Sequence, residues 1–304
     1  MCNTCGCNIT PGNAHLVIGE GRHAHASNGQ ASVEVLRNLL GENNHQAAHN
    51  RQHFNAHGVL AINLMSSPGA GKTSLLEATI DALAKEARIA VIEGDLETEN
   101  DAERIRAHGV PAVQIATGSA CHLDAHLVHD ALHRLDLEQL DLLFIENVGN
   151  LVCPASFDLG QHRQVALLSV PEGDDKPAKY PVMFRAAELV LLTKTDLLPV
   201  LTDFSPERAE RYLRQLASEA PFLHTAARGA GAGISAWLDW LRAELALVQA
   251  RAQALEETNE LPDHHHHHHH HHHGQHQDPH HQGPMHQGVH RQAHHHAQGH
   301  SHHD

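Results

Sequence analysis

The stretch "SSPGAGKTS" at residues 66–74 constrains the fold of this chain more than any other feature. It lies between an apolar run, "GVLAINLM", and an amphipathic stretch, "SLLEATIDALAKE", which predict a buried strand followed by a helix. A glycine-rich turn in that context, ending in Lys72 and Thr73, is typical of a phosphate-binding loop. The stretch therefore predicts an α/β protein that binds a nucleotide.

Each residue type in this loop suits contact with phosphate. Glycine lets the backbone wrap closely around the ligand, and the amides at the helix N-terminus favour anions. The Lys72 ammonium would reach the β- and γ-phosphates, and the Thr73 hydroxyl would bind Mg²⁺. Ser66 stands where the general motif has its first glycine. The predicted nucleotide-binding residues of the loop are Gly69, Ala70, Gly71, Lys72, Thr73 and Ser74.

Apolar runs alternate with amphipathic stretches from Val59 to about residue 255. This alternation predicts a mostly parallel sheet with helices on both faces. We expect a flexible metal-binding arm over residues 1–30, a helical histidine-containing segment over 31–57, and the nucleotide-binding domain over 58–255. Residues 256–304 lack aliphatic side chains to bury and are expected to be a disordered, metal-binding tail.

Two carboxylates lie at the ends of predicted strands, where they could bind Mg²⁺. Asp95 ends "RIAVIEGD" and Glu146 ends "LDLLFIE", and the carboxyl ends of parallel strands meet at one edge of a sheet. We predict Thr73, Asp95 and Glu146 as Mg²⁺ ligands, although Asp95 could instead cap the loop after its strand. Lys72, Thr73 and Glu146 are the predicted catalytic residues.

Guanine is the base that the sequence favours. "TKTD" ends another apolar strand and holds Lys194 and Asp196. The Asp196 carboxylate can accept from the two donors that guanine has and adenine lacks, while the Lys194 stem covers the ring. A backbone amide in "TAARGAG", such as that of Ala226, could donate to the guanine carbonyl. We therefore expect GTP and GDP as ligands.

The first residues, "MCNTCGC", place Cys2, Cys5 and Cys7 close together. C-x-x-C spacing lets two thiolates bind one ion, and Cys7 can fold back as a third ligand. Thiolates with the α-amino group suit Ni²⁺, although Zn²⁺ and Cu⁺ are chemically possible. An odd cysteine count of 5, in a chain without a secretory apolar segment, favours metal ligands over disulfides.

A second sulfur-containing set lies inside the predicted domain. Cys121 and His122 are adjacent in "GSACHLDAH", and Cys153 follows Gly149 by four residues. These three side chains could form an incomplete tetrahedral or planar metal site, or the cysteines could be buried structural residues. If Gly149 senses the γ-phosphate, the nucleotide could change metal affinity through Cys153.

Overall charge excludes some partners. A formal net charge of −15 argues against nucleic acid or an anionic membrane. No apolar run has transmembrane length, so the cytoplasm is the expected compartment.

Histidine is the most unusual part of the composition, with 35 residues in 304. Ten consecutive histidines, His264–His273, precede a tract of His, Gln, Gly and Pro, which favours a native metal-binding segment over a purification tag. Other histidines recur at helical spacing. Four of them, His45, His49, His53 and His57, could form chelating pairs four residues apart on one helix, but they are interpreted as its solvent-facing side. The same interpretation applies to His126, His129 and His133.

Taken in order, these motifs resemble those of the HypB family, the GTPases of hydrogenase nickel incorporation. The resemblance rests on "MCNTCGC", "NLMSSPGAGKTSLL", "IEGDLETENDA", "GSACHLDAH", "LLFIENVGNLVCPASFDLG", "PEGDDKPAKYP" and "TKTDLLP", and covers the chain to about residue 250. It implies a SIMIBI-type GTPase that delivers Ni²⁺ to the large subunit of [NiFe]-hydrogenase, with a HypA-type metallochaperone as partner.

The resemblance further implies a homodimer that forms on nucleotide or metal binding. It assigns Cys2, Cys5 and Cys7 to a high-affinity nickel site, and Cys121, His122 and Cys153 to an internal Zn²⁺/Ni²⁺ site. The role of the histidine-rich tail does not follow from the resemblance; it is expected to be a nickel reservoir because neutral imidazoles bind several Ni²⁺ ions weakly and release them as pH falls. The alternative is a nickel storage protein in which the GTPase is secondary; the related urease GTPases fit less well, because of the cysteine motifs.

Overall fold

The computed structural model describes residues 29–95, 100–118, 120, 122–227 and 233–259. The chain divides into two units after Leu261, and every described residue belongs to the first. The N-terminal cysteines, Cys121 and the histidine-rich tail lie outside the described residues, as do the expected disorder and flexibility of the chain ends.

A seven-stranded sheet forms the centre of the described unit, in the order β3-β2-β4-β1-β5-β6-β7. Every neighbouring pair of its strands is parallel. The strands are β1 (Leu60–Met65), β2 (Ile89–Asp95), β3 (Ala112–Ala116), β4 (Leu142–Glu146), β5 (Arg163–Ser169), β6 (Leu189–Thr193) and β7 (Phe222–His224). The predicted parallel α/β fold is confirmed.

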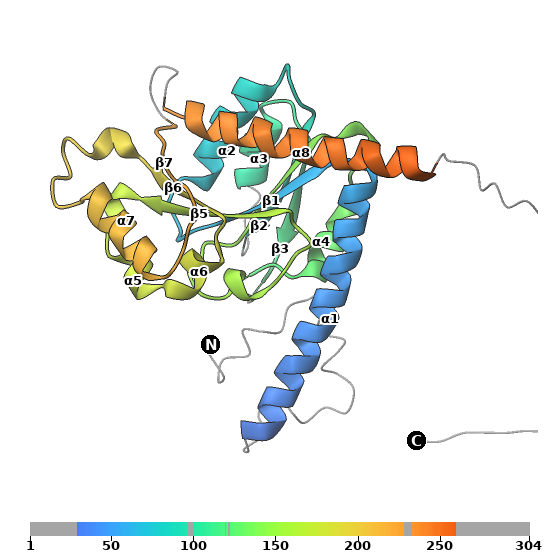
Figure 1. Ribbon diagram of the computed structural model, residues 1–304, viewed down its shortest axis with the longest axis horizontal. Coiled ribbons are helices and arrows are strands. Elements are labelled where there is room, and N and C mark those ends of the chain that lie inside the picture. The colour runs from blue at the N-terminus through green and yellow to red at the C-terminus, as the bar shows by residue number, and fades with distance from the viewer. Residues whose placement is uncertain (1–28, 96–99, 119, 121, 228–232, 260–304) are drawn as a thin grey trace, which may run out of the picture. The chain divides into compact units, whose positions relative to one another are not determined.

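Helices cover both faces of this sheet (Figure 1). The larger ones are α1 (Gly29–Ala56), α2 (Lys72–Leu83), α3 (Asn100–Arg106), α4 (Ala125–Leu132), α7 (Pro206–Gln215) and α8 (Ser235–Asn259). Two short helices, α5 (Lys176–Lys179) and α6 (Pro181–Ala186), precede β6. Within the described residues, no helix is both long and apolar enough to cross a membrane.

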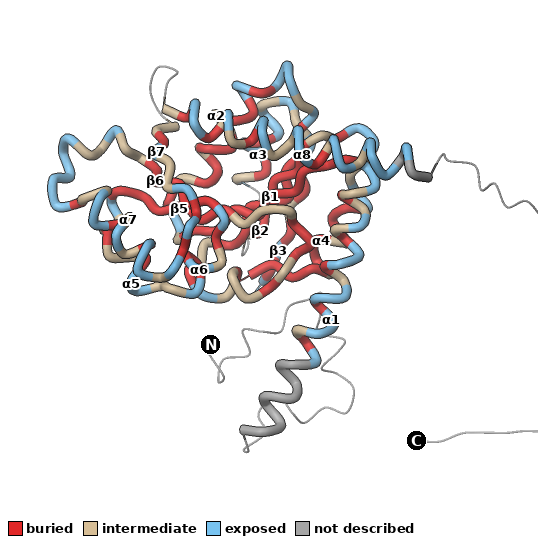
Figure 2. Tube along the Cα trace, viewed as in Figure 1, coloured by how far each residue is buried: buried red, intermediate tan, exposed pale blue. Residues whose placement is uncertain are grey.

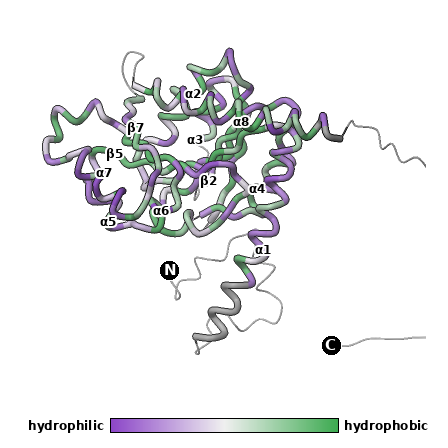
Figure 3. The backbone as a smooth tube through the Cα atoms, in the orientation of Figure 1, coloured by the Kyte–Doolittle hydropathy of each residue, from purple (hydrophilic) through white to green (hydrophobic). Residues whose placement is uncertain are grey.

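Successive side chains of each strand point to opposite faces of the sheet, so the hydrophobic core lies on both of its faces. In β4, Leu142 and Phe144 pack with α2 and α8 on one face, whereas Leu143 and Ile145 pack with α1 and α4 on the other. The strands are buried throughout most of their length, and the outer helix surfaces are exposed (Figure 2). The same contrast is visible in hydropathy, with apolar strands beneath polar helix surfaces (Figure 3). The central strands are thus buried on both sides, as their sequences predict, whereas the edge strands β3 and β7 are only partly buried.

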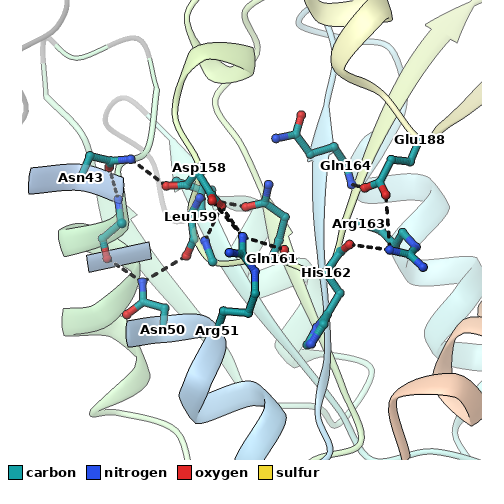
Figure 4. Close-up of polar contacts among 12 residues, drawn as sticks. Asn43, Asn50, Arg51, Asp158, Leu159, Gln161, His162, Arg163, Gln164 and Glu188 are labelled. Atoms are coloured by element: carbon teal, nitrogen blue, oxygen red, sulfur yellow. Dashed lines mark hydrogen bonds and ion pairs between the residues drawn. The ribbon is translucent and has the colours of Figure 1, made fainter. Parts of the chain in front are cut away.

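Polar contacts fasten the C-terminal half of α1 to the domain (Figure 4). Asn50 is fully buried, and its side-chain amide donates to the carbonyls of Ala125, at 2.8 Å, and Leu159, at 3.1 Å. Arg51 reaches both carboxylate oxygens of Asp158 at 2.8 Å. Since buried amide hydrogen bonds fix orientation as well as distance, this half of α1 is held in one position against α4 and the loop before β5.

Candidate functional site

The loop between β1 and α2 has the geometry of a phosphate cradle. Gly71 precedes α2 with a φ of 99°, a conformation that glycine adopts without strain. The next two residues, Lys72 and Thr73, form the first turn of α2 and are buried. The Lys72 ammonium donates to the Ser66 hydroxyl at 3.0 Å. The predicted loop residues are therefore brought together at a helix N-terminus, and all of them except Ala70, whose amide donates to the Ser67 carbonyl, line one cavity.

Glu146 is the predicted carboxylate that lies nearest to this loop. The Thr73 hydroxyl donates to its Oε1 at 3.1 Å, and Lys72 Nζ lies 3.8 Å from the same oxygen. Its other oxygen, Oε2, is buried and has no hydrogen-bond partner among the described residues. Burial raises the pKa of Glu146, and the ammonium of Lys72 opposes this shift. A hydroxyl and a buried carboxylate with an unsatisfied oxygen are suitable Mg²⁺ ligands.

A second buried carboxyl, Glu93, stands beside Glu146 and was not predicted. The two residues occupy the same register of the neighbouring strands β2 and β4. Burial raises the pKa of Glu93, and the charge of Glu146 raises it further. One signal was available in the sequence, since Glu93 interrupts an otherwise apolar strand. Asp95, two residues later, lies on the same face of β2 and at the edge of the same cavity.

The predicted base-binding segment closes over the phosphate loop. Lys194 adopts a left-handed conformation with a φ of 58°, and its ammonium donates to the carbonyl of Gly69 at 2.6 Å. The hydroxyl of Thr193 donates to the carbonyl of Ala70 at 2.7 Å. These bonds join the end of β6 to the loop after β1. They place Asp196 at the same cavity as the phosphate loop.

The amide of Ala226 is engaged elsewhere. It donates to the carbonyl of Gly233 at 2.9 Å, and Ala226 does not line the cavity. Its neighbours Thr225 and Ala227 do line it.

One cavity of about 600 Å³ unites these groups. It is large enough for a nucleotide-sized ligand. Among its lining residues are Gly69, Gly71, Lys72, Thr73, Ser74, Glu93, Asp95, Glu146, Gly149, Lys194 and Asp196. The carboxyl ends of β1, β2, β4 and β6 thus supply one site, as expected for a parallel sheet.

Two of the three residues predicted for the internal metal site, His122 and Cys153, are described, and they lie close to this cavity. His122 is fully buried and stacks on Phe157, with ring centres 4.0 Å apart. Burial lowers the pKa of His122 to about 4, so its imidazole is neutral at pH 7. Cys153 is half-buried and precedes the short 3₁₀ turn Pro154–Ser156. A neutral imidazole and a thiol are ligand types that suit zinc or nickel, and the third predicted ligand, Cys121, lies outside the described residues.

Asn147 joins this region to the nucleotide cavity. Its side-chain oxygen accepts from the amides of Leu123, at 3.1 Å, and Val148, at 3.0 Å. Its side-chain amide donates to Asn63 at 3.2 Å. Asn147 follows Glu146 directly and lines the cavity. A single buried side chain therefore connects the residue after His122 with the loop that holds Gly149.

Comparison with known proteins agrees with this geometry. Residues 60–224 match the family model described as CobW/HypB/UreG, nucleotide-binding domain. The chain is 51% identical over 253 residues to the hydrogenase maturation factor HypB of Azotobacter vinelandii, covering 80% of this chain and 83% of that protein.

Two solved structures are similar over most of the chain. The crystal structure of HypB from Helicobacter pylori in complex with nickel has a TM-score of 0.60 and 38% identity, covering 73% of this chain and 99% of that one. HypB from Archaeoglobus fulgidus has a TM-score of 0.63 and 38% identity, covering 68% of this chain and 100% of that one.

Proposed function

Because this chain belongs to the HypB family of hydrogenase maturation factors, we propose that it is a Mg²⁺-dependent GTPase that delivers nickel during maturation of a [NiFe]-hydrogenase. The main observation in favour is the contact among Lys72, Thr73 and Glu146 at the wall of one cavity. These are the groups that phosphoryl transfer requires, since its transition state is stabilised by positive charge and positioned donors.

Lys72 and the amides at the start of α2 would hold the β- and γ-phosphates and stabilise the charge that develops between them. Thr73 and Glu146 would hold Mg²⁺, with Asp95 and Glu93 at the same cavity as further oxygen ligands. The ion would neutralise phosphate charge when bound. Since Lys72 already lies against Ser66 and Glu146, its ammonium is positioned before the nucleotide arrives.

Guanine selection would come from Asp196, whose carboxylate accepts from the two donors on that base. The Lys194 stem would cover the ring, because its ammonium is fixed on Gly69. The donor to the guanine carbonyl would be the Ala227 amide, which replaces Ala226 in this role.

Nickel is the cargo of the proposed reaction. It would be bound by Cys2, Cys5 and Cys7 and at the internal site of Cys121, His122 and Cys153, where Zn²⁺ could also reside. Asn147 would transmit nucleotide state to the internal site, since it contacts both regions. The nickel-bound HypB of H. pylori, to which this chain is similar, supports the choice of metal.

The proposed partners are a HypA-type metallochaperone, the large subunit of the hydrogenase, and a second copy of this chain that associates on nucleotide or metal binding. The proposed compartment is the cytoplasm. The negative net charge of −15 supports a protein partner rather than nucleic acid or an anionic membrane.

A storage role is the second candidate, because the chain carries 35 histidines and their densest run is His264–His273. A truncation that ends at Leu261 separates the two proposals, since the described fold lies entirely within that part. Nickel per chain, GTP hydrolysis and hydrogenase activity at limiting nickel are measured for the full and the truncated chain. A loss of nickel content alone supports delivery with the tail as a reservoir. A loss of maturation despite intact GTP hydrolysis supports storage.

A further inference from the structure

Two histidine pairs that are far apart in the sequence meet on the surface of α1 and α4. The two helices pack against each other, and they lie side by side in Figure 1. Each carries histidines four residues apart, His49 and His53 on α1 and His129 and His133 at the end of α4. Such spacing places both rings of a pair on one side of a helix. From the sequence, each pair was interpreted as a solvent-facing surface of its own helix.

The rings form a continuous cluster, here termed the histidine cluster and defined as His49, His53, His129 and His133. Ring centres are 4.5 Å apart between His49 and His53, and 4.7 Å apart between His129 and His133. Between the helices, His129 lies 5.1 Å from His49 and 6.2 Å from His53. His129 therefore links the two pairs.

The helices that carry the rings are fixed in position by buried contacts. The Asn43 side-chain oxygen accepts from the amide of Ala125 at 2.9 Å, and Asn50 donates to the carbonyl of Ala125 at 2.8 Å. Phe54, fully buried on α1, belongs to the same core cluster as Val128 and Leu132 of α4. The packed helices thus hold the four histidines near one another before an ion binds, which lowers the entropic cost of binding.

The spacing of the rings agrees with a shared ion. With metal–nitrogen bonds of about 2.1 Å, two imidazoles on one ion have ring centres roughly 4.5–6 Å apart. No three His, Cys, Asp or Glu side chains in the described part of the chain already converge on one point, so the rings must rotate to close a shell. Rotation is possible because His49 and His133 are exposed, and His53 and His129 are half-exposed.

The directions of the pKa shifts of His53 and His129 also suit a metal. Burial and then the neighbouring histidines lower the pKa of His129 and of His53, while Asp130 acts in the opposite direction on His129. Neutral imidazoles keep their lone pairs, which are what a divalent ion binds. Imidazole nitrogen is a preferred ligand of Zn²⁺, Ni²⁺ and Cu²⁺.

We propose that the histidine cluster binds a borderline divalent ion, Ni²⁺ or Zn²⁺, as a bridge between α1 and α4. This site is distinct from the cysteine sets and from the histidine-rich tail. It is independent of the nucleotide cavity and of the proposed GTPase, because none of its four residues lines that cavity. Since it is partly exposed, it can load and release metal without opening the core.

The test requires a readout that resolves single residues, because the tail also binds metal. Carbethoxylation of histidines in the full chain is mapped by mass spectrometry with and without saturating Zn²⁺, and again with Ni²⁺. The double variant His129→Gln/His133→Gln removes the α4 side. His45→Gln is the matched control, an exposed histidine one turn before His49 on α1. Circular dichroism verifies that the variants are folded.

We expect metal to reduce the reactivity of all four histidines severalfold in the unchanged chain and in His45→Gln. In the double variant, His49 and His53 should become as reactive with metal as without it. Unchanged protection of His49 and His53 in the double variant would overturn the bridge. Loss of the protection of His49 and His53 in His45→Gln would also overturn it, because it would indicate a site on α1 alone. Absence of protection in the unchanged chain would overturn it as well.

Thermal unfolding gives a second measurement. Metal that binds the tail equally in the folded and unfolded chain adds no stability, whereas an ion that bridges two folded helices does. The metal-dependent increase in Tm should therefore be smaller in the double variant than in His45→Gln. Equal increases in the two variants would contradict the proposal.

Discussion

Glu93 and Glu146 stand at the same register of two neighbouring parallel strands, both buried and facing one phosphate-binding loop. Two carboxyl groups so close cannot both ionise easily, and burial and the charge of Glu146 raise the pKa of Glu93. Lys72 lies 3.8 Å from Glu146. Without a bound cation, Glu146 is therefore the carboxylate paired with Lys72, and Glu93 holds the proton.

This relationship predicts a pH-dependent effect of Glu93→Gln. The pKa of Glu93 is higher in the folded chain than in the unfolded chain, so the folded chain keeps this proton to a higher pH. The free energy of unfolding therefore falls as pH rises above the usual range for glutamate. Gln mimics the protonated acid and removes that penalty. In nucleotide-free protein, we expect Glu93→Gln to have a higher Tm than the unchanged chain above about pH 5. Each kcal/mol gained in the free energy of unfolding corresponds to roughly 2–4 °C in Tm.

The measurement is thermal unfolding from pH 5 to pH 8, with Glu42→Gln as a control for an exposed carboxylate on α1. The stability difference between Glu93→Gln and the unchanged chain should widen as pH rises. A constant difference would show that Glu93 ionises normally.

Lys72→Ala should abolish GTP turnover, with a fall of at least about 100-fold in kcat, because it removes the ammonium that faces the phosphates. It also leaves Glu146 buried without its cation, so the Tm should fall. Lys179→Ala is the matched control, since that exposed lysine forms a surface ion pair with Asp175. Persistent turnover in Lys72→Ala would refute the phosphate-loop assignment.

Asp196→Asn should change base preference rather than fold. The amide presents a donor where the carboxylate accepted, so affinity for GTP should fall by about 10-fold or more, corresponding to the loss of one charged hydrogen bond. Xanthosine triphosphate, which has a carbonyl in place of the guanine amino group, should bind relatively better. Competition binding measures both, and an unchanged ratio of the two affinities would exclude Asp196 from base recognition.

Gly149→Ala should weaken nucleotide binding through sterics. A Cβ at this position would lie 2.9 Å from the Cα and the backbone nitrogen of Pro68, so the two loops that border the cavity must separate. We expect GTP affinity to fall by about 10-fold. The control is Gly41→Ala, where no atom lies within 4 Å and the added methyl should stabilise α1 by up to about 1 kcal/mol.

Asn147→Ala should reduce the coupling between nucleotide and metal. Its side chain connects the Leu123 amide, next to His122, with Val148 beside Gly149. Metal affinity at the internal site is measured with and without a non-hydrolysable GTP analogue, and the ratio is the coupling. We expect the ratio to approach one in Asn147→Ala. An undiminished ratio in a folded variant would mean that the coupling runs elsewhere.

The sequence predicted those features whose signal is local. Apolar runs located the strands, and the spacing of Gly71, Lys72 and Thr73 located the phosphate loop. Helices α3, α5 and α6 were not predicted because they are short, with 7, 4 and 6 residues, and tertiary contacts decide whether such segments are helical.

Features that depend on pairing between distant segments could not be predicted in the same way. Glu93 becomes part of the site only through the register of β2 and β4. The approach of His49 to His129 depends on the packing of α1 on α4. The turn of Ala226 towards Gly233 likewise depends on contacts that a single sequence does not display.

The hydrogen bonds of Asn50 have a mechanical consequence. Its amide binds at once to Ala125, three residues after His122, and to Leu159, two residues after the Phe157 on which His122 stacks. The helix thus connects the chain segment that carries His122 with the segment that carries Phe157. A displacement of one segment against the other would have to break or stretch a hydrogen bond of Asn50. The position of the buried imidazole is therefore tied to the position of α1 through this one side chain.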